Sequence, residues 1–293
     1  MFVKEGLWPG IQYPRVPGHE VAGIIDELGA EVIGWKNGQR VGVGWHGGQD
    51  NTCLECRRGH FLYCQNPKVA GISYDGGYQQ YMVAPVEALA AIPDALSDAE
   101  AGPLLCGGVT TFNALRHSGA SPGSLVAVQG VGGLGHLAIQ FANKFGYKVA
   151  AIGRGPENSV LAKKLGASVY IDSQSSSAAQ ELQKLGGAQI LATAPNSKAM
   201  SGLIDGLAPT GKFIVVGISP DPIAVTPLQL ITGERAIQGS AVGTPTDSED
   251  TMRFAELTGV RPMIETYRLE KADAAFSRMM SGKAEFRVVL TME

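Results

Sequence analysis

The sequence lacks an excess of basic residues, any long apolar run and a high content of charge. Only 17% of its 293 residues are charged, and 24 basic against 27 acidic side chains give a net charge of −3. This balance predicts neither a nucleic-acid partner nor attraction to an anionic membrane. No stretch approaches the roughly 20 apolar residues of a membrane-spanning helix, and the residues from Met1 to Gly6 do not resemble a signal peptide.

Cysteine is scarce as well. The chain has four, and three of them, Cys53, Cys56 and Cys64, lie close together. Such clustering is typical of a metal site in a reducing compartment rather than of a disulfide framework, so we expect a cytoplasmic protein. Apolar residues, at 44%, and 39 glycines indicate a globular α/β or β-rich protein with many tight turns.

Glycines mark the junction between an apolar run, Leu125–Val128, and a second run with helical spacing that begins at Leu137. A buried strand, a glycine turn and a helix in this order are typical of dinucleotide binding. The first glycine permits the turn, the second lets a pyrophosphate approach the backbone, and the last lets the helix pack closely. N–H groups at the helix start would hold the phosphates. The residues expected at the cofactor are Gly130, Gly132, Gly133, Leu134 and Gly135.

The expected secondary structure changes character along the chain. Glycine-punctuated apolar segments predict a small β-barrel with strands at 21–25, 40–44, 78–83 and 88–92, followed by a helical region at 99–117. From Ser124 onward, strands alternate with helices, which predicts a parallel, doubly wound sheet. Its expected strands are 124–130, 148–152, 168–172, 188–193, 212–217 and 236–242. Its expected helices are 134–145, 157–165, 177–184 and 197–206. Helices near 247–257 and 270–281 and a strand at 286–290 complete the chain.

The cysteine cluster has the spacing Cys53-x2-Cys56-x7-Cys64. Three thiolates at this spacing suit a structural zinc site, which normally has four ligands. Asp50 stands three residues before Cys53, and a carboxylate oxygen is an acceptable zinc ligand. We therefore expect Asp50 to join the three cysteines at a structural zinc that stabilises a polar loop.

Two further candidates are ambiguous when taken alone. His19 stands between Gly18 and Glu20, where a hydrogen-bonded core histidine is the simpler interpretation. Cys106 follows two leucines and would pass for an ordinary buried thiol.

In combination, these motifs resemble the zinc-dependent medium-chain alcohol dehydrogenases. Gly18-His19-Glu20-x2-Gly23-x5-Gly29-x2-Val32 is similar to the zinc signature of that family, and the segment from Leu104 to Thr110 is similar to the one that carries a further ligand of the catalytic zinc. The cysteine cluster, the glycine turn and the segment from Gly282 to Arg287 also match, so the resemblance covers the whole chain.

The resemblance implies a GroES-like β-barrel catalytic domain, incomplete at its N-terminus, and a doubly wound, parallel-sheet Rossmann domain. Residues 1–105 would form the first part of the catalytic domain, 106–244 the dinucleotide-binding domain, and 245–293 the return to the catalytic domain. It also implies a homodimer or homotetramer that acts on a small primary alcohol or aldehyde.

The resemblance implies roles for single residues as well. His19 and Cys106 would bind the catalytic zinc, with Glu20 beside it as a neighbouring or exchanging ligand. Thr110 would lie against the nicotinamide, and Arg287 would contact the pyrophosphate.

Two aromatic residues, Trp8 and Trp45, resemble those that narrow the alcohol pocket in this family. Ordinary core packing explains them equally well.

The chain departs from the family pattern at two points. Asp50 stands where most relatives have the first cysteine of the cluster. Relatives also carry a further zinc-binding cysteine just upstream of the segment that matches Phe2–Gly6, so the sequence as written predicts a catalytic zinc one ligand short and impaired turnover. Two alternatives stay open: a zinc-free reductase of the quinone-reductase type, and a non-catalytic nucleotide-binding subunit.

The cofactor choice depends on the strand expected at 148–152. An acidic residue about 20 residues beyond the glycines is typical of NAD sites, because it binds the ribose 2′-hydroxyl. Here the strand is followed by Gly153-Arg154-Gly155, which has no acid. The planar guanidinium of Arg154 suits a phosphate group, so we predict that NADP(H) is preferred and NAD(H) possible.

Overall fold

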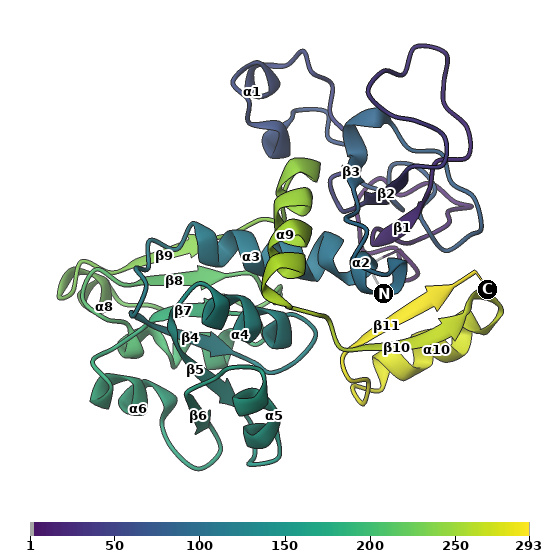
Figure 1. Cartoon of the computed structure of the whole chain (residues 1–293). Helices are drawn as coiled ribbons and strands as arrows, with labels where there is room; N and C mark the ends of the chain where they lie inside the picture. The colour runs from purple at the N-terminus through teal and green to yellow at the C-terminus, as the bar shows by residue number, and fades with distance from the viewer. Residues whose placement is uncertain (1–2, 293) are drawn as a thin grey trace. The chain divides into compact units, whose positions relative to one another are not determined.

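The computed structural model describes residues 3–292, which form two compact units (Figure 1). The first unit contains the chain up to Val109 and again from Val242 onward, and the second is Thr110–Ala241. These limits differ by a few residues from the expected ones, and they place Cys106 in the first unit. None of the helices in the described part of the chain is long and apolar enough to cross a membrane.

The second unit is built on a six-stranded sheet with the order β6-β5-β4-β7-β8-β9. Every neighbouring pair of strands is parallel, which confirms the predicted doubly wound sheet. The order reverses beside β4, the strand that leads into the glycine turn. The strands are β4 (Leu125–Gln129), β5 (Lys148–Gly153), β6 (Val169–Asp172), β7 (Gln189–Ala192), β8 (Lys212–Val215) and β9 (Ala236–Gly239).

Helices join these strands, and their apolar faces bury the sheet. Phe141 and Phe213 are fully buried in this unit, as the helical spacing and the apolar strand predict. The sequence analysis missed α8, although Thr226 and Gln229 form a capping box at its start. The helices are α3 (Val109–Arg116), α4 (Gly135–Lys144), α5 (Asn158–Lys164), α6 (Ala178–Lys184), α7 (Ser197–Ser201), a 3-10 turn (Ile204–Gly206) and α8 (Pro227–Ile231).

The first unit begins with an antiparallel sheet of β1 (Val21–Ile24), β2 (Arg40–Val43) and β3 (Leu89–Ala91). The strand predicted at 78–83 is wrong: this segment forms bends, and Tyr81 and Val83 are exposed. Its alternating apolar side chains therefore do not pack on a buried face of a sheet. The connections include α1 (Leu54–Arg57), 3-10 turns at Phe61–Tyr63 and Val86–Ala88, α2 (Asp98–Pro103) and a π-helical turn (Leu104–Gly108).

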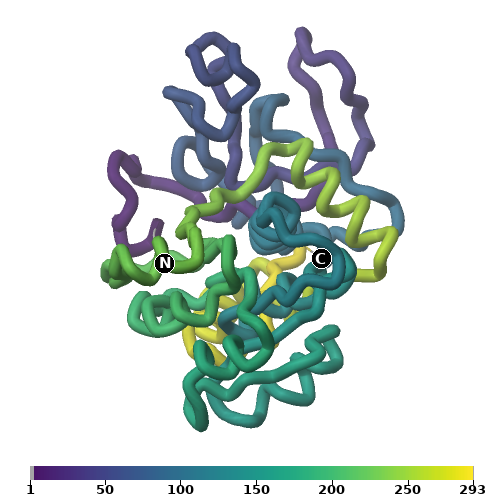
Figure 2. Tube along the Cα trace, turned by 90° about the vertical axis from the view of Figure 1, so that its left-hand side faces the viewer, coloured from purple at the N-terminus to yellow at the C-terminus, as the bar shows by residue number. Residues whose placement is uncertain are grey.

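The returning chain completes the first unit, and its path can be followed in the light green and yellow of Figure 2. The helix α9 packs against β3, where Glu249 accepts a hydrogen bond from the Ala91 N–H at 2.9 Å. The sequence analysis missed β10, which pairs in parallel with the predicted final strand β11. The elements are α9 (Pro245–Thr258), β10 (Ile264–Arg268), a 3-10 turn (Leu269–Lys271), α10 (Ala272–Met280) and β11 (Arg287–Thr291).

Replacement of Phe141 by alanine tests the core of the second unit. Phe141 is fully buried, and its ring meets the edge of Phe112 with centroids 5.5 Å apart. Its loss should lower the free energy of unfolding by about 3–5 kcal/mol, because a cavity replaces the ring. Denaturant titration measures this change. Ile218→Ala, at a side chain that is 74% exposed, is the control and should stay within about 0.5 kcal/mol. Equal effects of the two variants would contradict this assignment of the core.

Candidate functional site

The glycine turn lies at the carboxyl end of β4 and leads directly into α4. Gly130 has a φ of +100° and donates its N–H to the Ile152 carbonyl at 2.8 Å. A Cβ on Gly135 would collide with the Gly130 carbonyl, so this contact requires glycine. Gly132 faces open space, with no atom within 4 Å of the position that a Cβ would take. A ligand can therefore reach the backbone at Gly132.

The surroundings of the turn fit a pyrophosphate. No side chain caps the start of α4, so the positive end of its dipole is open to an anion, while the His136 and Leu137 N–H groups already bond to the Gly132 and Leu134 carbonyls. The His136 side chain is buried, and its Nδ1 lies 2.9 Å from the Gly132 carbonyl. This contact was not predicted from the sequence.

The second candidate site is the cysteine cluster, where the structure brings Asp50, Cys53, Cys56 and Cys64 together. One ligand atom from each lies within 4.8 Å of all the others. Cys53 caps α1 by accepting the Cys56 N–H, and the Cys53 and Cys64 sulfurs are 3.9 Å apart. Three sulfur donors and one oxygen at these separations fit a tetrahedral zinc site.

The charges of the cluster are set by local hydrogen bonds. The Cys53 N–H, the Asn66 amide and the Thr52 N–H hold the pKa of the Asp50 carboxyl well below its usual range. The N–H groups of Gln65 and Cys56 lower the pKa of Cys53. Burial, reinforced by the neighbouring thiols, raises the pKa of Cys56 to about 12. The cluster thus combines an ionised carboxylate with thiols in unequal environments.

The third candidate region is centred on His19, just before β1. The Gly77 N–H bonds to the Gly18 carbonyl at 3.1 Å, and the Tyr78 N–H bonds to the Pro17 carbonyl at 3.0 Å. A Cβ on Gly76 would collide with the Gly18 carbonyl. The segment predicted as a strand at 78–83 therefore begins by holding the His19 segment through its backbone.

Two tryptophans lie on one side of His19. Its ring meets Trp45 at right angles with centroids 4.9 Å apart, and Trp45 meets Trp8 with centroids 5.2 Å apart. Burial lowers the pKa of His19, which favours the neutral ring that binds metals. The structure thus brings both predicted pocket tryptophans to one side of His19. Their contact with substrate stays a prediction.

Glu20 is bound by Arg287, which comes from β11. The Arg287 Nη2 donates to both carboxylate oxygens of Glu20. The two charges of this ion pair act in opposite directions on the pKa values of His19 and Cys106. Burial together with Glu20 raises the pKa of Cys106 to about 12. The ion pair also acts on Tyr78, whose pKa is raised by burial and by Glu20, and which the sequence analysis did not single out.

Within residues 3–292, the cysteine cluster alone gathers three or more potential ligands. His19, Glu20 and Cys106 share one electrostatic environment but do not form a second such group, and the Glu20 carboxylate is bound by Arg287. The predicted zinc contact of Glu20 and the predicted pyrophosphate contact of Arg287 therefore stay predictions.

Cys106 owes its position to a change in helix type. Ser97 and Glu100 form a capping box at the start of α2, which continues into the π-helical turn that contains Cys106. Such π-helical turns are frequent at functional sites, because they redirect side chains within a helix. Thr110 follows in α3, half-buried, in the second unit.

Comparison with known proteins identifies the family. The model of the alcohol dehydrogenase GroES-like domain matches residues 1–94, and that of the zinc-binding dehydrogenase matches 133–257. The chain is 45% identical over 297 residues to alcohol dehydrogenase patD from Penicillium expansum, covering 99% of this chain and 85% of that protein. The chain belongs to the zinc-type medium-chain alcohol dehydrogenases. It is an NAD(P)-dependent oxidoreductase, and the predicted resemblance is confirmed.

Solved alcohol dehydrogenase structures match this alcohol dehydrogenase along nearly all of its chain. A cinnamyl alcohol dehydrogenase (SbCAD4) from Sorghum bicolor has a TM-score of 0.89 at 29% identity, covering 100% of this chain and 87% of that one. CAD from Helicobacter pylori, complexed with NADP(H), has a TM-score of 0.87 at 26% identity, covering 99% and 86%. The family favours the dehydrogenase over the quinone-type reductase and the non-catalytic subunit.

Replacement of Asp50 by asparagine tests the oxygen ligand of the cluster. Asparagine keeps an acceptor for the N–H groups of Thr52 and Cys53, both 2.9 Å from Asp50 Oδ1, but removes the charge. Zinc affinity should fall at least about tenfold, because the site loses an anionic ligand. Competition with a chromophoric chelator measures the change. Asp50→Cys should retain zinc.

Glu55→Gln is the matched control for Asp50→Asn. Glu55 lies in the same loop but pairs with Arg58 and His60 outside the ligand group, so zinc affinity should not change. Equal zinc affinity in Asp50→Asn and the wild type would show that Asp50 only holds the turn.

Proposed function

We propose that this alcohol dehydrogenase transfers a hydride between a primary alcohol or aldehyde and NADP(H), with NAD(H) as the weaker cofactor. The observation that carries the cofactor preference is the segment after β5, Gly153-Arg154-Gly155. These three residues carry no carboxylate for a ribose 2′-hydroxyl and include a cation, although the carboxylates of Asp172 and Glu157 lie beside Gly155.

The surroundings of Arg154 support this preference. Its side chain is exposed and makes no ion pair within the described residues, so a ligand would not have to displace a partner. The planar guanidinium can give two parallel hydrogen bonds to phosphate oxygens. The Helicobacter pylori relative, which was solved with NADP(H), is consistent with this preference.

We assign the substrate-binding site to the first unit. We assign His19 and Cys106 as ligands of a catalytic zinc, with Glu20 beside it. A zinc ion bound there would act as a Lewis acid toward the substrate oxygen. Trp45 packs against His19 and fixes its ring, and Trp8 packs on Trp45, so the aromatic pair offers an apolar wall to a small alcohol.

The remaining assignments follow the family resemblance. We assign Thr110 to the nicotinamide and the residues from Gly130 to Gly135 to the pyrophosphate, supported by the uncapped helix start and the open face of Gly132. We also propose a homodimer or homotetramer on the resemblance alone.

Replacement of Arg154 by alanine tests the cofactor preference. The dissociation constant of NADPH should rise about 10- to 100-fold, because charge-assisted hydrogen bonds to the phosphate are lost. That of NADH should change less than about twofold. Fluorescence titration of both cofactors measures the ratio. Lys144→Ala, an exposed cation at the end of α4, is the control for a general loss of charge. An unchanged ratio in Arg154→Ala would rule out the preference.

Replacement of His19 by alanine tests the catalytic zinc. We expect kcat/KM for a primary alcohol to fall at least about 100-fold, because even residues that only support metal ligands can cost that much. Metal analysis should show the loss of zinc bound outside the cysteine cluster. His117→Ala, at an exposed histidine after α3, is the control. Unchanged zinc content and turnover in His19→Ala would exclude His19 as a ligand.

A further inference from the structure

Two side chains of β6 hold the segment after β5. The Tyr170 hydroxyl donates to the Gly155 carbonyl at 2.6 Å. The Gly155 N–H donates to Asp172 Oδ1 at 2.8 Å. Both backbone polar groups of Gly155 are therefore bound by side chains rather than by a strand. We call Tyr170 and Asp172 the β6 clamp.

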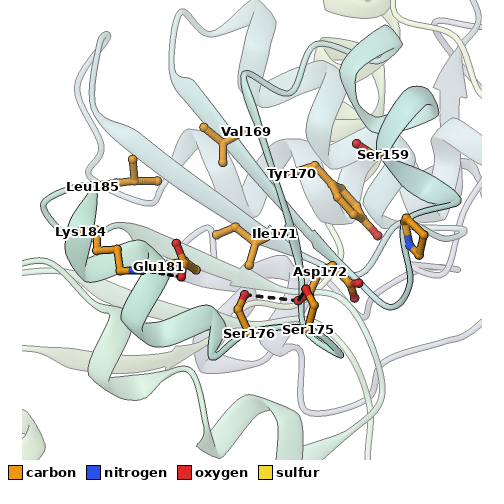
Figure 3. Close-up of a pocket in the computed structure, with 11 residues that line it drawn as sticks. Ser159, Val169, Tyr170, Ile171, Asp172, Ser175, Ser176, Glu181, Lys184 and Leu185 are labelled. Carbon is orange, nitrogen blue, oxygen red and sulfur yellow. Dashed lines mark hydrogen bonds and ion pairs between the residues drawn. The ribbon is translucent and has the colours of Figure 1, made fainter.

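The strand geometry explains why these two residues act together. In the parallel pairing of β5 and β6, Gly153 lies opposite Asp172, so the residues that follow Gly153 pass over the end of β6. Tyr170 and Asp172 are two positions apart and project to the same face of the sheet. Figure 3 shows the Tyr170 ring and the Asp172 carboxylate on one side of the strand, with Leu185, Lys184 and Glu181 on the other.

Further contacts fix the clamp. The Ser173 N–H and hydroxyl both donate to the Gly153 carbonyl, at 2.9 and 2.8 Å, and Asp172 Oδ1 also accepts the Gln174 N–H at 2.9 Å. A Cβ on Gly153 would collide with the Tyr170 hydroxyl, so the clamp needs glycine there. Burial, with the charges of Asp172 and Glu157, raises the pKa of Tyr170, which therefore stays a donor at neutral pH.

Arg154 stands between Gly155, which the clamp holds, and Gly153, whose carbonyl accepts from Ser173. Its own side chain is exposed, and no hydrogen bond or ion pair holds its guanidinium among the residues that the structure describes. Holding a long, flexible side chain at a ligand costs conformational entropy, and a fixed backbone reduces that cost. The clamp therefore acts on the geometry of Arg154 without contacting its guanidinium.

The clamp is not part of the packed core. β6 is an edge strand, and a hollow of about 590 Å³ lies beside it, lined in part by Tyr170, Asp172, Pro156 and Ser159. Tyr170 is half-buried. Phenylalanine keeps the ring and removes only the hydroxyl, so we expect the Tyr170→Phe variant to fold.

We propose that Tyr170 and Asp172 are positioning residues for cofactor choice: they fix Gly155, and through it Arg154, for the 2′-phosphate of NADP(H). This inference rests on the proposed preference for NADP(H). Neither residue contacts the phosphate. Their effect is therefore expected only with ligands that carry a 2′-phosphate, and only while Arg154 is present.

Calorimetric titration with two fragments of the cofactor tests the clamp without turnover. The probes are adenosine 2′,5′-bisphosphate and 5′-AMP, which differ by the 2′-phosphate. Tyr170→Phe should weaken the bisphosphate about three- to tenfold and leave 5′-AMP within about twofold, the range expected for one hydrogen bond. In the Arg154→Ala background, Tyr170→Phe should have no further effect.

Conservative variants separate positioning from damage to the fold. Asp172→Asn keeps an acceptor for the Gly155 N–H and should bind the bisphosphate at least as tightly as the wild type. Asp172→Ala should weaken it as Tyr170→Phe does. Tyr147→Phe removes another tyrosine hydroxyl bond of this unit, to the Ala120 carbonyl, and should change neither ligand.

The Arg154→Ala variant shows whether a negative result refutes the clamp alone or also the proposed preference for NADP(H). If Arg154→Ala weakens the bisphosphate but Tyr170→Phe does not, the clamp is refuted and the NADP(H) preference stands. Equal loss of both ligands in Tyr170→Phe would also refute it, because a general structural role predicts that result. If Arg154→Ala has no effect on the bisphosphate, the proposed preference is wrong and the clamp falls with it.

Discussion

Close contact between two backbone segments, with no side chain between them, is the constraint on which both the glycine turn and the His19 segment depend. Gly135 starts α4 against the Gly130 carbonyl, which brings the positive end of the helix dipole to the glycine turn. Gly76 lies against the Gly18 carbonyl, which holds the His19 segment. A single methyl group at either contact would push the segments apart. The glycine-rich composition therefore serves positioning as much as flexibility.

The cysteine cluster and the His19 region differ in how the sequence specifies them. The cysteine cluster comes from one short loop, so its ligand set could be predicted from spacing, and the structure brings its four donors together. The His19 region is assembled from the segment of His19 and Glu20 and from two remote segments that contribute Cys106 and Arg287. Motif resemblance located these residues, but no spacing rule joins Glu20 to Arg287 rather than to a metal.

Sequence patterns predicted most of the second unit, because a buried parallel strand is a continuous apolar run between glycines. They failed where contacts between distant residues determine whether a segment forms a strand. The segment 78–83 has strand-like alternation but lies on the surface, and β10 is short and partly exposed, with little apolar signal. The contacts of Trp45 with His19 and of Tyr170 with Gly155 join residues that are 26 and 15 positions apart, and their proximity depends on how neighbouring strands pair.

The pairing of Glu20 with Arg287 has a consequence for the order of assembly during synthesis. The two residues are 267 positions apart, and the whole second unit lies between them in the chain. Domains generally fold as units while the chain emerges from the ribosome, so the Rossmann sheet can be complete before β11 is made. Until then the Glu20 carboxylate has no guanidinium partner. The ion pair of the His19 region is thus completed last, when the Rossmann sheet can already be folded.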